Sequence, residues 1–310
     1  MIMKVGPACL PCFIDDIAGA LDMLDVPSRA RMSVLRECMA YLYKHLDENS
    51  PPSYFITQLH RILKRTLGMK MPFSDLRRGC LRAGMEIART VEKRAASLSG
   101  YRRFRFLVRW AVAANSLDFR TAGAGYGLTT ASVEKTLHGS FGKGLTVDQS
   151  KQILAAAKAA RTIVFIPDNV GELPFDKLLV GLLSSYGASV TVPLRGGPIT
   201  SDAVMADARA AGIGAVSSRM ILSGPDTLGI SFAEMSPGLS AALSSADLII
   251  AKGQANYYVL SEFGDRYPNA AIACLFTAKC AGVWKAFGCT GKAAIAAIIK
   301  QPARARSVRT

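Results

Sequence analysis

Acidic, amide and lysine side chains follow four separate apolar segments of this sequence, close to where each segment ends. In chain order they are Asp168, Asn169, Glu172, Asp202, Lys252, Asn256 and Lys279. Carboxylate and amide oxygens are the ligands that hard cations such as Mg²⁺ and Mn²⁺ prefer, whereas lysines attract phosphate groups. A divalent cation with lysines nearby is typical of sites that transfer or hydrolyse phosphoryl groups.

Three of these residues form the predicted metal site. Asp168 and Asn169 follow TIVFIP at 162–167, and Asp202 ends RGGPITSD after the apolar run ASVTVPL at 188–194. Because two carboxylates leave coordination positions for water and substrate oxygens, we expect Mg²⁺ or Mn²⁺, with Co²⁺ or Ni²⁺ as alternatives. We expect Asp202 to lie at a loop edge, where substitution by Asn costs at most about 1 kcal/mol of stability.

Each of these side chains also has a simpler explanation. Asp168, Asp202 and Asn256 could cap the helices that follow them. Glu172 could complement a helix dipole, and Lys252 could be a solvated loop lysine. Their common placement after strands favours the functional interpretation, because ligands of open parallel sheets bind outside the carboxyl ends of the strands.

The periodicity of the apolar residues predicts an α/β fold. Residues 13–109 show helical spacing without a strand-like run, whereas short apolar segments alternate with helical ones after about residue 145. Continuous apolar strands alternating with helices indicate a parallel sheet that is covered on both faces. We therefore predict a helical N-terminal region at 1–110, a three-layer α/β/α domain with a mostly parallel sheet at 111–300, and a basic disordered tail at 301–310.

Several helix ends can be predicted from single residues. Ser53, Ser74 and Thr146 are candidate N-caps, because a hydroxyl can accept a hydrogen bond from the free N–H groups of the first turn. Gly68 is a candidate C-terminal stop. After the apolar run that ends at residue 276, we expect the chain to finish in helical structure.

Composition and charge limit the class of protein. The chain has 310 residues, of which 50% are hydrophobic, and a formal net charge of +15. This is an ordinary globular composition, with a positive excess that attracts anions, both phosphorylated metabolites and nucleic acid. No apolar run reaches the roughly 18 residues of a membrane span, and the N-terminus does not resemble a signal peptide. We expect a cytoplasmic protein without a membrane partner.

Seven cysteines are an odd number for a disulfide framework and indicate reduced thiols. Cys9 and Cys12 form a C-x-x-C pair, which supplies two of the four ligands of a structural zinc site. We regard them as a possible accessory metal site, with buried thiols as the alternative. GAGYG at 123–127 does not follow a strand, and FGCTGKA at 287–293 lacks the pattern of a phosphate-binding loop.

Five segments, in this order, resemble the damage-control phosphatase family, also known as domain of unknown function 89. They are AANSLDF (113–119), DNVGELPFD (168–176), RGGPITSDAVMADA (195–208), KGQANYYVLSE (252–262) and KC (279–280). The N-terminal CLPC also resembles the stand-alone prokaryotic branch of the family. The resemblance implies a helical region before a three-layer α/β/α domain, and metal-dependent hydrolysis of phosphate monoesters, often of sugar phosphates or damaged metabolites.

The resemblance also assigns roles to single residues. It implies the same three metal ligands, a phosphate contact at Lys252, and a pocket wall at Asn115 and Asp118. The chain departs from the family pattern at a few positions that are expected to face the substrate. These are the MPF segment (71–73), Ala114, Ser201, Ala255 and Tyr258.

We therefore predict a metal-dependent phosphatase that acts on a phosphate monoester of a small metabolite, with Asp168 and Lys252 as catalytic residues. The predicted substrate-binding residues are Asn115, Asp118, Glu172, Lys252, Asn256 and Lys279. Attack by water is preferred over attack by Asp168, because that carboxylate already serves as a metal ligand.

Two other function classes stay open. An S-adenosylmethionine-dependent methyltransferase also uses a doubly wound sheet, although the turn DNVGE contains a single glycine. A non-catalytic protein that binds anions or nucleic acid fits the charge. The basic helices carry no recognised reading motif, which makes a nucleic-acid partner the weaker expectation.

Overall fold

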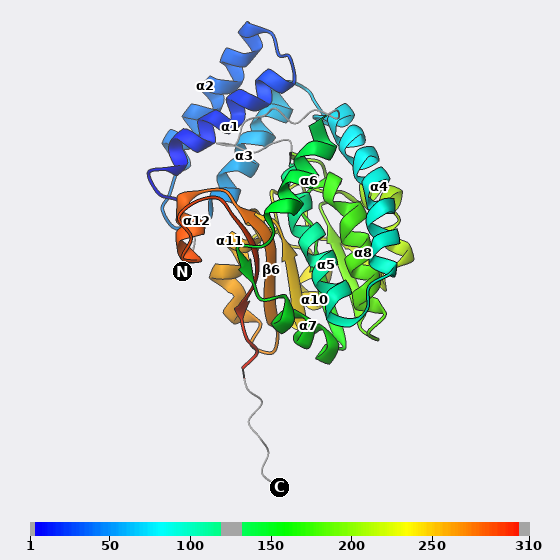
Figure 1. Cartoon of the computed structure of the whole chain (residues 1–310). Coiled ribbons are helices and arrows are strands. Elements are labelled where there is room, and N and C mark those ends of the chain that lie inside the picture. The colour runs from blue at the N-terminus through cyan, green and yellow to red at the C-terminus, as the bar shows by residue number, and fades with distance from the viewer. Residues whose placement is uncertain (1–3, 119–131, 304–310) are drawn as a thin grey trace.

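The computed structural model describes residues 4–118 and 132–303, which form helices around one seven-stranded sheet (Figure 1). The strands are β1 (Val147–Asp148), β2 (Thr162–Ile166), β3 (Ser189–Leu194), β4 (Arg219–Leu222), β5 (Leu248–Lys252), β6 (Ala271–Ala278) and β7 (Ala293–Lys300). The helices are α1 (Cys9–Met23), α2 (Ser28–His45), α3 (Pro52–Thr66), α4 (Ser74–Ala96), α5 (Gly100–Ala113), α6 (Val133–Lys143), α7 (Ser150–Ala159), α8 (Leu173–Ser184), α9 (Met205–Ala211), α10 (Pro237–Ser244), α11 (Gln254–Phe263) and α12 (Ala281–Ala286). Two short 3₁₀ turns, η1 (Ala114–Leu117) and η3 (Val170–Glu172), lie at the site described below.

The sheet is mostly parallel, as predicted. Its strand order is β1-β7-β6-β5-β2-β3-β4, and β6 and β7 are the antiparallel pair. The chain builds outward from β2 through β3 to β4, then returns to pair β5 on the other side of β2. The order therefore reverses between β2 and β5, and such a reversal leaves a crevice at the carboxyl ends of the two strands, where ligands of α/β proteins bind.

Alternate residues of the strands face opposite layers of helices. Ile163 and Phe165 of β2 belong to a cluster with α5, α7 and α8, whereas Val164 and Ile166 belong to a second cluster with α10 and α11. Because both faces of the strand are buried, its sequence is continuously apolar. The predicted three-layer α/β/α arrangement is confirmed.

The first three helices enclose a hydrophobic cluster of their own, which includes Phe13, Ile17, Phe55 and Leu59. In Figure 1, α1, α2 and α3 lie together beyond one end of the sheet. The Lys64 ammonium on α3 donates to the Pro198 carbonyl at 2.8 Å and to Asp226 at 2.6 Å. These acceptors lie in loops after β3 and β4, so the helices α1–α3 cover the carboxyl end of the sheet.

The second half of α4 and the helix α5 pack with the sheet, whereas Cys80 in the first half of α4 belongs to the cluster of α1–α3. Val91 of α4 and Phe104 of α5 belong to the same buried cluster as Phe165 of β2. The predicted division of the chain at residue 110 stays a prediction, and the change of hydrophobic cluster falls within α4, between Cys80 and Ala88. Of the predicted tail, residues 304–310 lie outside the described residues, as does the segment at 123–127.

β7 and β1 are strands where the sequence predicted helical structure. β7 is an eight-residue strand that pairs with β6, where a helical end was expected. Its sequence AAIAAIIK has no clear period, so pairing with a buried neighbour decides its structure. The backbone N–H of Thr146 donates to the Ala294 carbonyl at 2.8 Å, and the next two residues form β1 beside β7. Thr146 therefore does not cap α7, which begins at Ser150.

The predicted serine caps are also wrong. α3 begins at Pro52, with Pro51 at the N-cap, so Ser53 lies inside the first turn. α4 begins at Ser74 itself, and the N-cap Phe73 adopts a left-handed φ of 60°. The expected stop at Gly68 is consistent with its φ of 63°, two residues after α3 ends. Across the described residues, no helix is both long and apolar enough to cross a membrane.

Candidate active site

Two loops bring the predicted metal ligands together at the carboxyl ends of β2 and β3. Asn169 and Asp202 form an isolated antiparallel bridge between the loops. The Ala203 amide donates to the Asp168 carbonyl at 2.7 Å, and the Val170 amide donates to the Ser201 carbonyl at 2.8 Å. This short backbone pairing fixes the separation of the two loops, so it places the side chains of Asp168 and Asp202 without depending on the side chains themselves.

Asp168 is held by two side-chain amides. Its Oδ2 accepts hydrogen bonds from Nδ2 of Asn169 at 2.8 Å and from Nδ2 of Asn115 at 3.1 Å. Gly253, after β5, passes so close that any Cβ atom at that position would overlap the Asp168 carboxylate. Gly253 also has a φ of 78°, a conformation that favours glycine. A glycine at position 253, directly after β5, therefore leaves the space that the Asp168 carboxylate occupies.

Glu172 ties the amides to a buried lysine. Its Oε1 accepts from Nδ2 of Asn169 at 2.6 Å and from Nδ2 of Asn115 at 2.8 Å. Its Oε2 accepts from Lys252 Nζ at 2.5 Å, and this ammonium also donates to Asp176 at 2.7 Å. The side chains of Glu172 and Lys252 are both fully buried. Glu172 thus orients the amides around Asp168 instead of facing the solvent.

The contacts of Lys252 differ from those expected of a phosphate-binding lysine. Burial disfavours its charge, but Asp176 and Glu172 outweigh burial and raise the lysine pKa. The same burial raises the pKa of Asp176 to about 7, against the opposing effect of Lys252. The predicted contact between Lys252 and phosphate stays a prediction. Lys252 lies between two buried carboxylates, and this position is typical of a lysine that stabilises the fold by neutralising them.

Asp202 is completely buried, so the expectation of a loop-edge residue is wrong. Its Oδ1 accepts from Arg195 Nε at 3.0 Å and from the Gly229 amide at 2.9 Å, and its Oδ2 accepts from Thr200 at 3.0 Å. Arg77 of α4 donates to the Asp202 carbonyl at 2.8 Å. The loop between 195 and 202 folds back on itself and encloses the side chain, which linear sequence cannot reveal.

Asp118 and Lys279 form the more accessible part of the site. Lys279 Nζ lies 2.6 Å from Asp118 Oδ2, and Ser201 donates to Asp118 Oδ1 at 2.8 Å. The Ser201 hydroxyl also lies 2.5 Å from Asn169 Oδ1. The exposed fraction of the side chain is 12% for Asp118 and 16% for Lys279. These two residues therefore connect the buried cluster to solvent.

Asn256 lies away from the accessible part of the site. Its Oδ1 accepts from the Ile230 amide at 2.8 Å, and its Nδ2 donates to the Lys252 carbonyl at 2.7 Å. The residue is fully buried. It connects the carboxyl end of β5 to the loop before α10, and its predicted contact with substrate stays a prediction.

The charges around Asp168 fit a bound cation. Burial, followed by the carboxylates of Glu172, Asp202 and Asp118, raises the pKa of Asp168 well above its ordinary value. A divalent cation would offset this repulsion, and the carboxylate and amide oxygens are hard donors. Within residues 4–118 and 132–303, no three His, Cys, Asp or Glu side chains converge as a complete metal site. The donor set therefore fits a cation that takes its remaining ligands from water or substrate.

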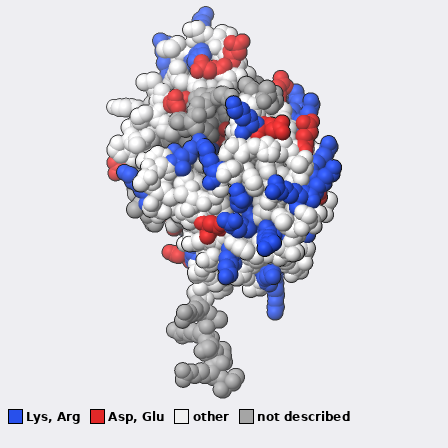
Figure 2. Space-filling model, viewed as in Figure 1, with Lys and Arg blue, Asp and Glu red and all other residues white. Residues whose placement is uncertain are grey.

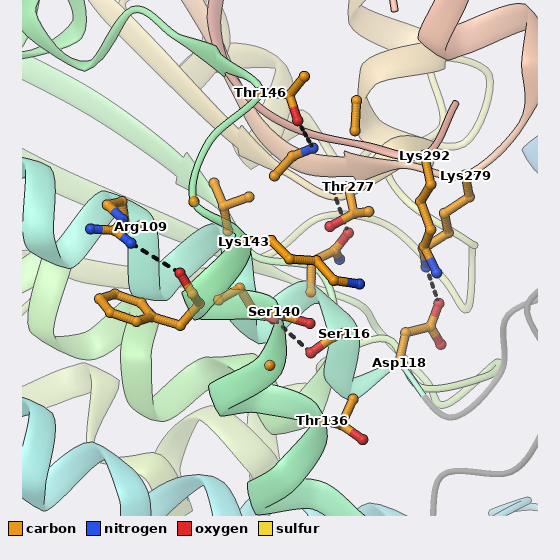
Figure 3. A pocket seen from close by; sticks show the side chains of 18 of the residues that line it. Arg109, Ser116, Asp118, Thr136, Ser140, Lys143, Thr146, Thr277, Lys279 and Lys292 are labelled. Atoms are coloured by element: carbon orange, nitrogen blue, oxygen red, sulfur yellow. Dashed lines mark hydrogen bonds and ion pairs between the residues drawn. The ribbon is translucent and has the colours of Figure 1, made fainter. Parts of the chain in front are cut away.

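A cavity of about 620 Å³ opens beside this cluster. Asn115, Asp118 and Lys279 lie in its wall, together with Lys143 of α6 and Lys292 before β7. Figure 3 shows the side chains of these three lysines extending toward the same space, with Asp118 at one side. The volume is in the range of cavities that hold small-molecule ligands. The cluster around Asp168 thus has an adjoining space for a metabolite.

Known proteins resemble the chain over nearly its whole length. A family model described as the damage-control phosphatase ARMT1-like domain matches residues 5–294. The chain belongs to this family. A damage-control phosphatase of Archaeoglobus fulgidus is 27% identical over 288 residues, covering 92% of this chain and 96% of that protein. One from Pyrococcus horikoshii is 29% identical over 284 residues, with coverages of 91% and 93%.

A solved structure agrees with this assignment. The crystal structure of a DUF89 family protein from Pyrococcus horikoshii matches with a TM-score of 0.84 at 27% identity, covering 96% of this chain and all of that one, 100%. The predicted family and fold are confirmed, and membership supports a phosphatase role. Assignment to the branch with an N-terminal C-x-x-C stays a prediction.

The two cysteines of this motif lie on α1, half-buried. Burial, followed by the charge of Asp16, raises the pKa of Cys12 to about 12. A thiol with a raised pKa is a poor source of the thiolate that a metal requires, so an accessory metal site at Cys9 and Cys12 gains no support from their surroundings. It stays a prediction.

Sequence reasoning missed several residues that build the damage-control phosphatase site. Asp176 and Arg195 both lie in segments that resemble the family. Asp176 lies within the first turn of α8, away from any strand end. Arg195 directly follows β3, but an arginine is not a metal ligand, and its pairing with Asp202 depends on how the loop folds. Arg77 comes from α4, more than 120 positions from the carbonyls of Thr200 and Asp202 that it binds. Lys143 had no sequence signal, because it is a single lysine between two glycines in an otherwise ordinary segment. Lys292 lies in FGCTGKA, which supports no prediction because it lacks the pattern of a phosphate-binding loop.

Proposed function

We propose that the chain is a metal-dependent phosphatase that hydrolyses a phosphate monoester of a small metabolite, such as a sugar phosphate or a damaged metabolite. One observation carries the proposal: Asp168, Asn169 and Asp202 come together at the ends of β2 and β3, and Asn115, which contacts Asp168, lines a cavity with several lysines, in a member of the damage-control phosphatase family. Family membership favours this function over the methyltransferase and over a non-catalytic anion-binding protein.

Asp168, Asn169 and Asp202 are proposed to hold the cation, Mg²⁺ or Mn²⁺, with Co²⁺ or Ni²⁺ as alternatives. The bound cation would supply positive charge that makes the phosphorus atom more electrophilic. Asn115 and Glu172 act through Asp168. The Asn115 amide holds Oδ2 of the aspartate, and Glu172 holds both amides in place. Oδ1 of Asp168 accepts no hydrogen bond from a described residue and is the oxygen proposed to face the cation.

Lys279 is the lysine best placed to bind the phosphate, because it lies in the cavity wall and keeps solvent access. Asp118 fixes its ammonium at 2.6 Å. Lys252 instead donates to both Glu172 Oε2 and Asp176, which leaves Oε1 of Glu172 to accept from the two amides. This assignment replaces the direct phosphate contact expected of Lys252.

Hydrolysis is proposed to proceed by direct attack of water on phosphorus, since Oδ2 of Asp168 is engaged by two amides and Oδ1 is the proposed ligand. The stereochemical course at phosphorus, measured with a substrate whose phosphate is made chiral by oxygen isotopes, tests this step. One direct displacement by water inverts the configuration. Retention of configuration, together with an acyl phosphate at Asp168 that borohydride can trap, would instead show attack by the aspartate.

The overall function is tested by measuring phosphate release from p-nitrophenyl phosphate and from a panel of phosphorylated metabolites. Protein stripped with EDTA should be inactive and should regain activity with Mg²⁺, Mn²⁺, Co²⁺ or Ni²⁺. Asp168→Asn should lose activity while keeping its circular dichroism spectrum. Folded protein that releases no phosphate with any of the four metals would contradict the proposal, as would activity that is retained in Asp168→Asn.

A further inference from the structure

The cavity beside Asp168 contains more positive charge than one phosphate monoester requires. Lys143, Lys279 and Lys292 all line it. Lys279 pairs with Asp118, whereas neither Lys143 nor Lys292 forms an ion pair with a described residue. Burial and then the charges of Lys279 and Lys143 lower the pKa of Lys292, which shows that the three ammonium groups lie close enough to repel one another. An anion between them would relieve this repulsion.

Two further cations line the cavity, the exposed Lys135 of α6 and Arg109, and Arg109 is already engaged by other groups. The Arg109 guanidinium donates to the Phe141 carbonyl at 3.0 Å and lies over the Phe141 ring, 4.3 Å from its centre. Arg109 therefore supports the C-terminal turn of α6, at whose end Lys143 lies. This contact gives Lys143 a fixed backbone position although its side chain is exposed. Figure 3 shows Lys143 projecting from α6 toward the side of the cavity where Lys279 and Lys292 lie.

Hydroxyl groups line the space between these lysines and the site. Thr136, Ser140 and Thr277 are in the cavity wall. The hydroxyls of Thr136 and Ser140, both on α6, form no hydrogen bond with a described residue. The backbone N–H of Thr277 donates to Asn115 Oδ1 at 3.0 Å, which positions this threonine beside the site. Such a lining suits a ligand with several hydroxyl groups, because each can exchange a hydrogen bond with water for one with the wall.

The positive charge is also not spread evenly over the surface. In Figure 2, Lys and Arg side chains predominate over the lower right of the molecule, where α5 and α7 lie, whereas acidic groups accompany them near the upper end of α4. This field favours the approach of multiply charged anions.

We propose that Lys143 and Lys292 form a second anion subsite, so that the preferred substrate is a polyhydroxylated phosphate monoester with a further carboxylate or phosphate at its far end. This inference rests on the proposed phosphatase function, and it concerns the end of the substrate that does not react. The reacting phosphate lies beside Asp168 and Lys279, and the second anionic group lies between the other two lysines.

Three esters with the same six-carbon chain test the subsite: sorbitol 6-phosphate, 6-phosphogluconate and sorbitol 1,6-bisphosphate. They differ at carbon 1, which is a hydroxymethyl group in the first, a carboxylate in the second and a phosphorylated hydroxymethyl group in the third. Wild-type kcat/KM for the two doubly anionic esters should exceed that for sorbitol 6-phosphate by about tenfold, the effect of one charge-assisted contact. In the double variant Lys143→Gln/Lys292→Gln, this preference should fall to about twofold or less.

Lys151→Gln is the matched control, because Lys151 is exposed on α7 and outside the cavity; it should keep the preference. Equal kcat/KM for the three esters in the wild type, or a preference that the double variant retains, would overturn the subsite. If none of the esters were hydrolysed with any metal, the phosphatase proposal would fail. Titration calorimetry with the same esters would then test the subsite independently of catalysis. Tighter binding of the doubly anionic esters that is lost in the double variant would support the subsite. Equal binding of the three esters would overturn it.

Discussion

The side-chain amide of Asn115 donates to Asp168 at 3.1 Å and to Glu172 at 2.8 Å, and its carbonyl accepts from the Thr277 amide at 3.0 Å. One buried residue after α5 thus joins the ends of β2 and β6. The side-chain Nδ2 contacts Asp168 and Glu172, while Oδ1 is held by Thr277. Asn115 is therefore a positioning residue, whose effect on catalysis should be separable from its effect on stability.

Asn115→Ala should lower kcat about tenfold to hundredfold, because Asp168 loses one of the two donors that fix its orientation. The buried partners left without hydrogen bonds should cost about 1–3 kcal/mol of unfolding free energy. Steady-state kinetics and urea unfolding measure the two effects. Metal affinity should weaken together with kcat. Asn49→Ala, at an exposed asparagine, is the control. A loss of stability with unchanged kcat and metal affinity would show that Asn115 only supports the fold.

Lys252 and Lys279 should respond differently to the same substitution. Lys252→Met leaves Glu172 and Asp176 buried without their counter-ion and should cost about 3–5 kcal/mol of stability. Lys279→Met removes a partly exposed charge and should cost about 1 kcal/mol, while kcat/KM falls about a hundred- to a thousandfold. Thermal unfolding and kinetics on both variants separate the roles. A stable Lys252→Met protein with greatly reduced activity would restore Lys252 as the phosphate contact.

Asp202→Asn should destabilise the chain, contrary to the expectation for a loop-edge residue. The substitution removes the buried counter-ion of Arg195, and breaking such a pair costs about 3–5 kcal/mol. Metal affinity should fall as well. Chemical denaturation in EDTA isolates the structural contribution from the metal contribution. If the midpoint in EDTA matched that of the wild type, the Arg195 pair would carry no stability and Asp202 would act through the metal alone.

The docking of α3 should depend on acid pH. Burial raises the pKa of Asp226, but the hydrogen bond from Lys64 and the charges of Lys64 and Arg61 outweigh it, so the pKa of Asp226 is lowered overall. A carboxyl whose folded pKa lies below its unfolded pKa stabilises the fold at neutral pH and loses this contribution as pH falls through the folded pKa. The contribution should be about 1 kcal/mol, since the pair keeps some solvent access.

Urea unfolding at pH 7 and at pH 3 tests this dependence. Asp226→Asn should be less stable than the wild type at pH 7, and the difference should shrink at pH 3. Asp265→Asn, at an exposed aspartate without such partners, should show no comparable change. A difference between Asp226→Asn and the wild type that is equal at both pH values would mean that the charge of Asp226 does not stabilise the docking of α3.

Local sequence determined much of this protein. The continuous apolar character of residues 163–166 reflects a strand that packs on both faces, and it predicted the central parallel sheet. Because parallel strands end at a common edge, the same pattern predicted that Asp168, Asn169 and Asp202 would meet, and the bridge between their loops shows that they do. These features depend on periodicity and on strand direction, which a linear sequence records.

Tertiary structure alone decided which charged groups face the cavity. Lys252 and Lys279 look alike in sequence, because each lies at the carboxyl end of an apolar strand. In the fold, Lys252 contacts two buried carboxylates, whereas Lys279 lies in the cavity wall. Asp202 looked like a loop residue until the fold placed Arg195 and Arg77 around it. The ionic partner of a side chain is set by distances between segments far apart in the chain, and burial decides its energy. Neither quantity is encoded in the spacing of residues along one segment.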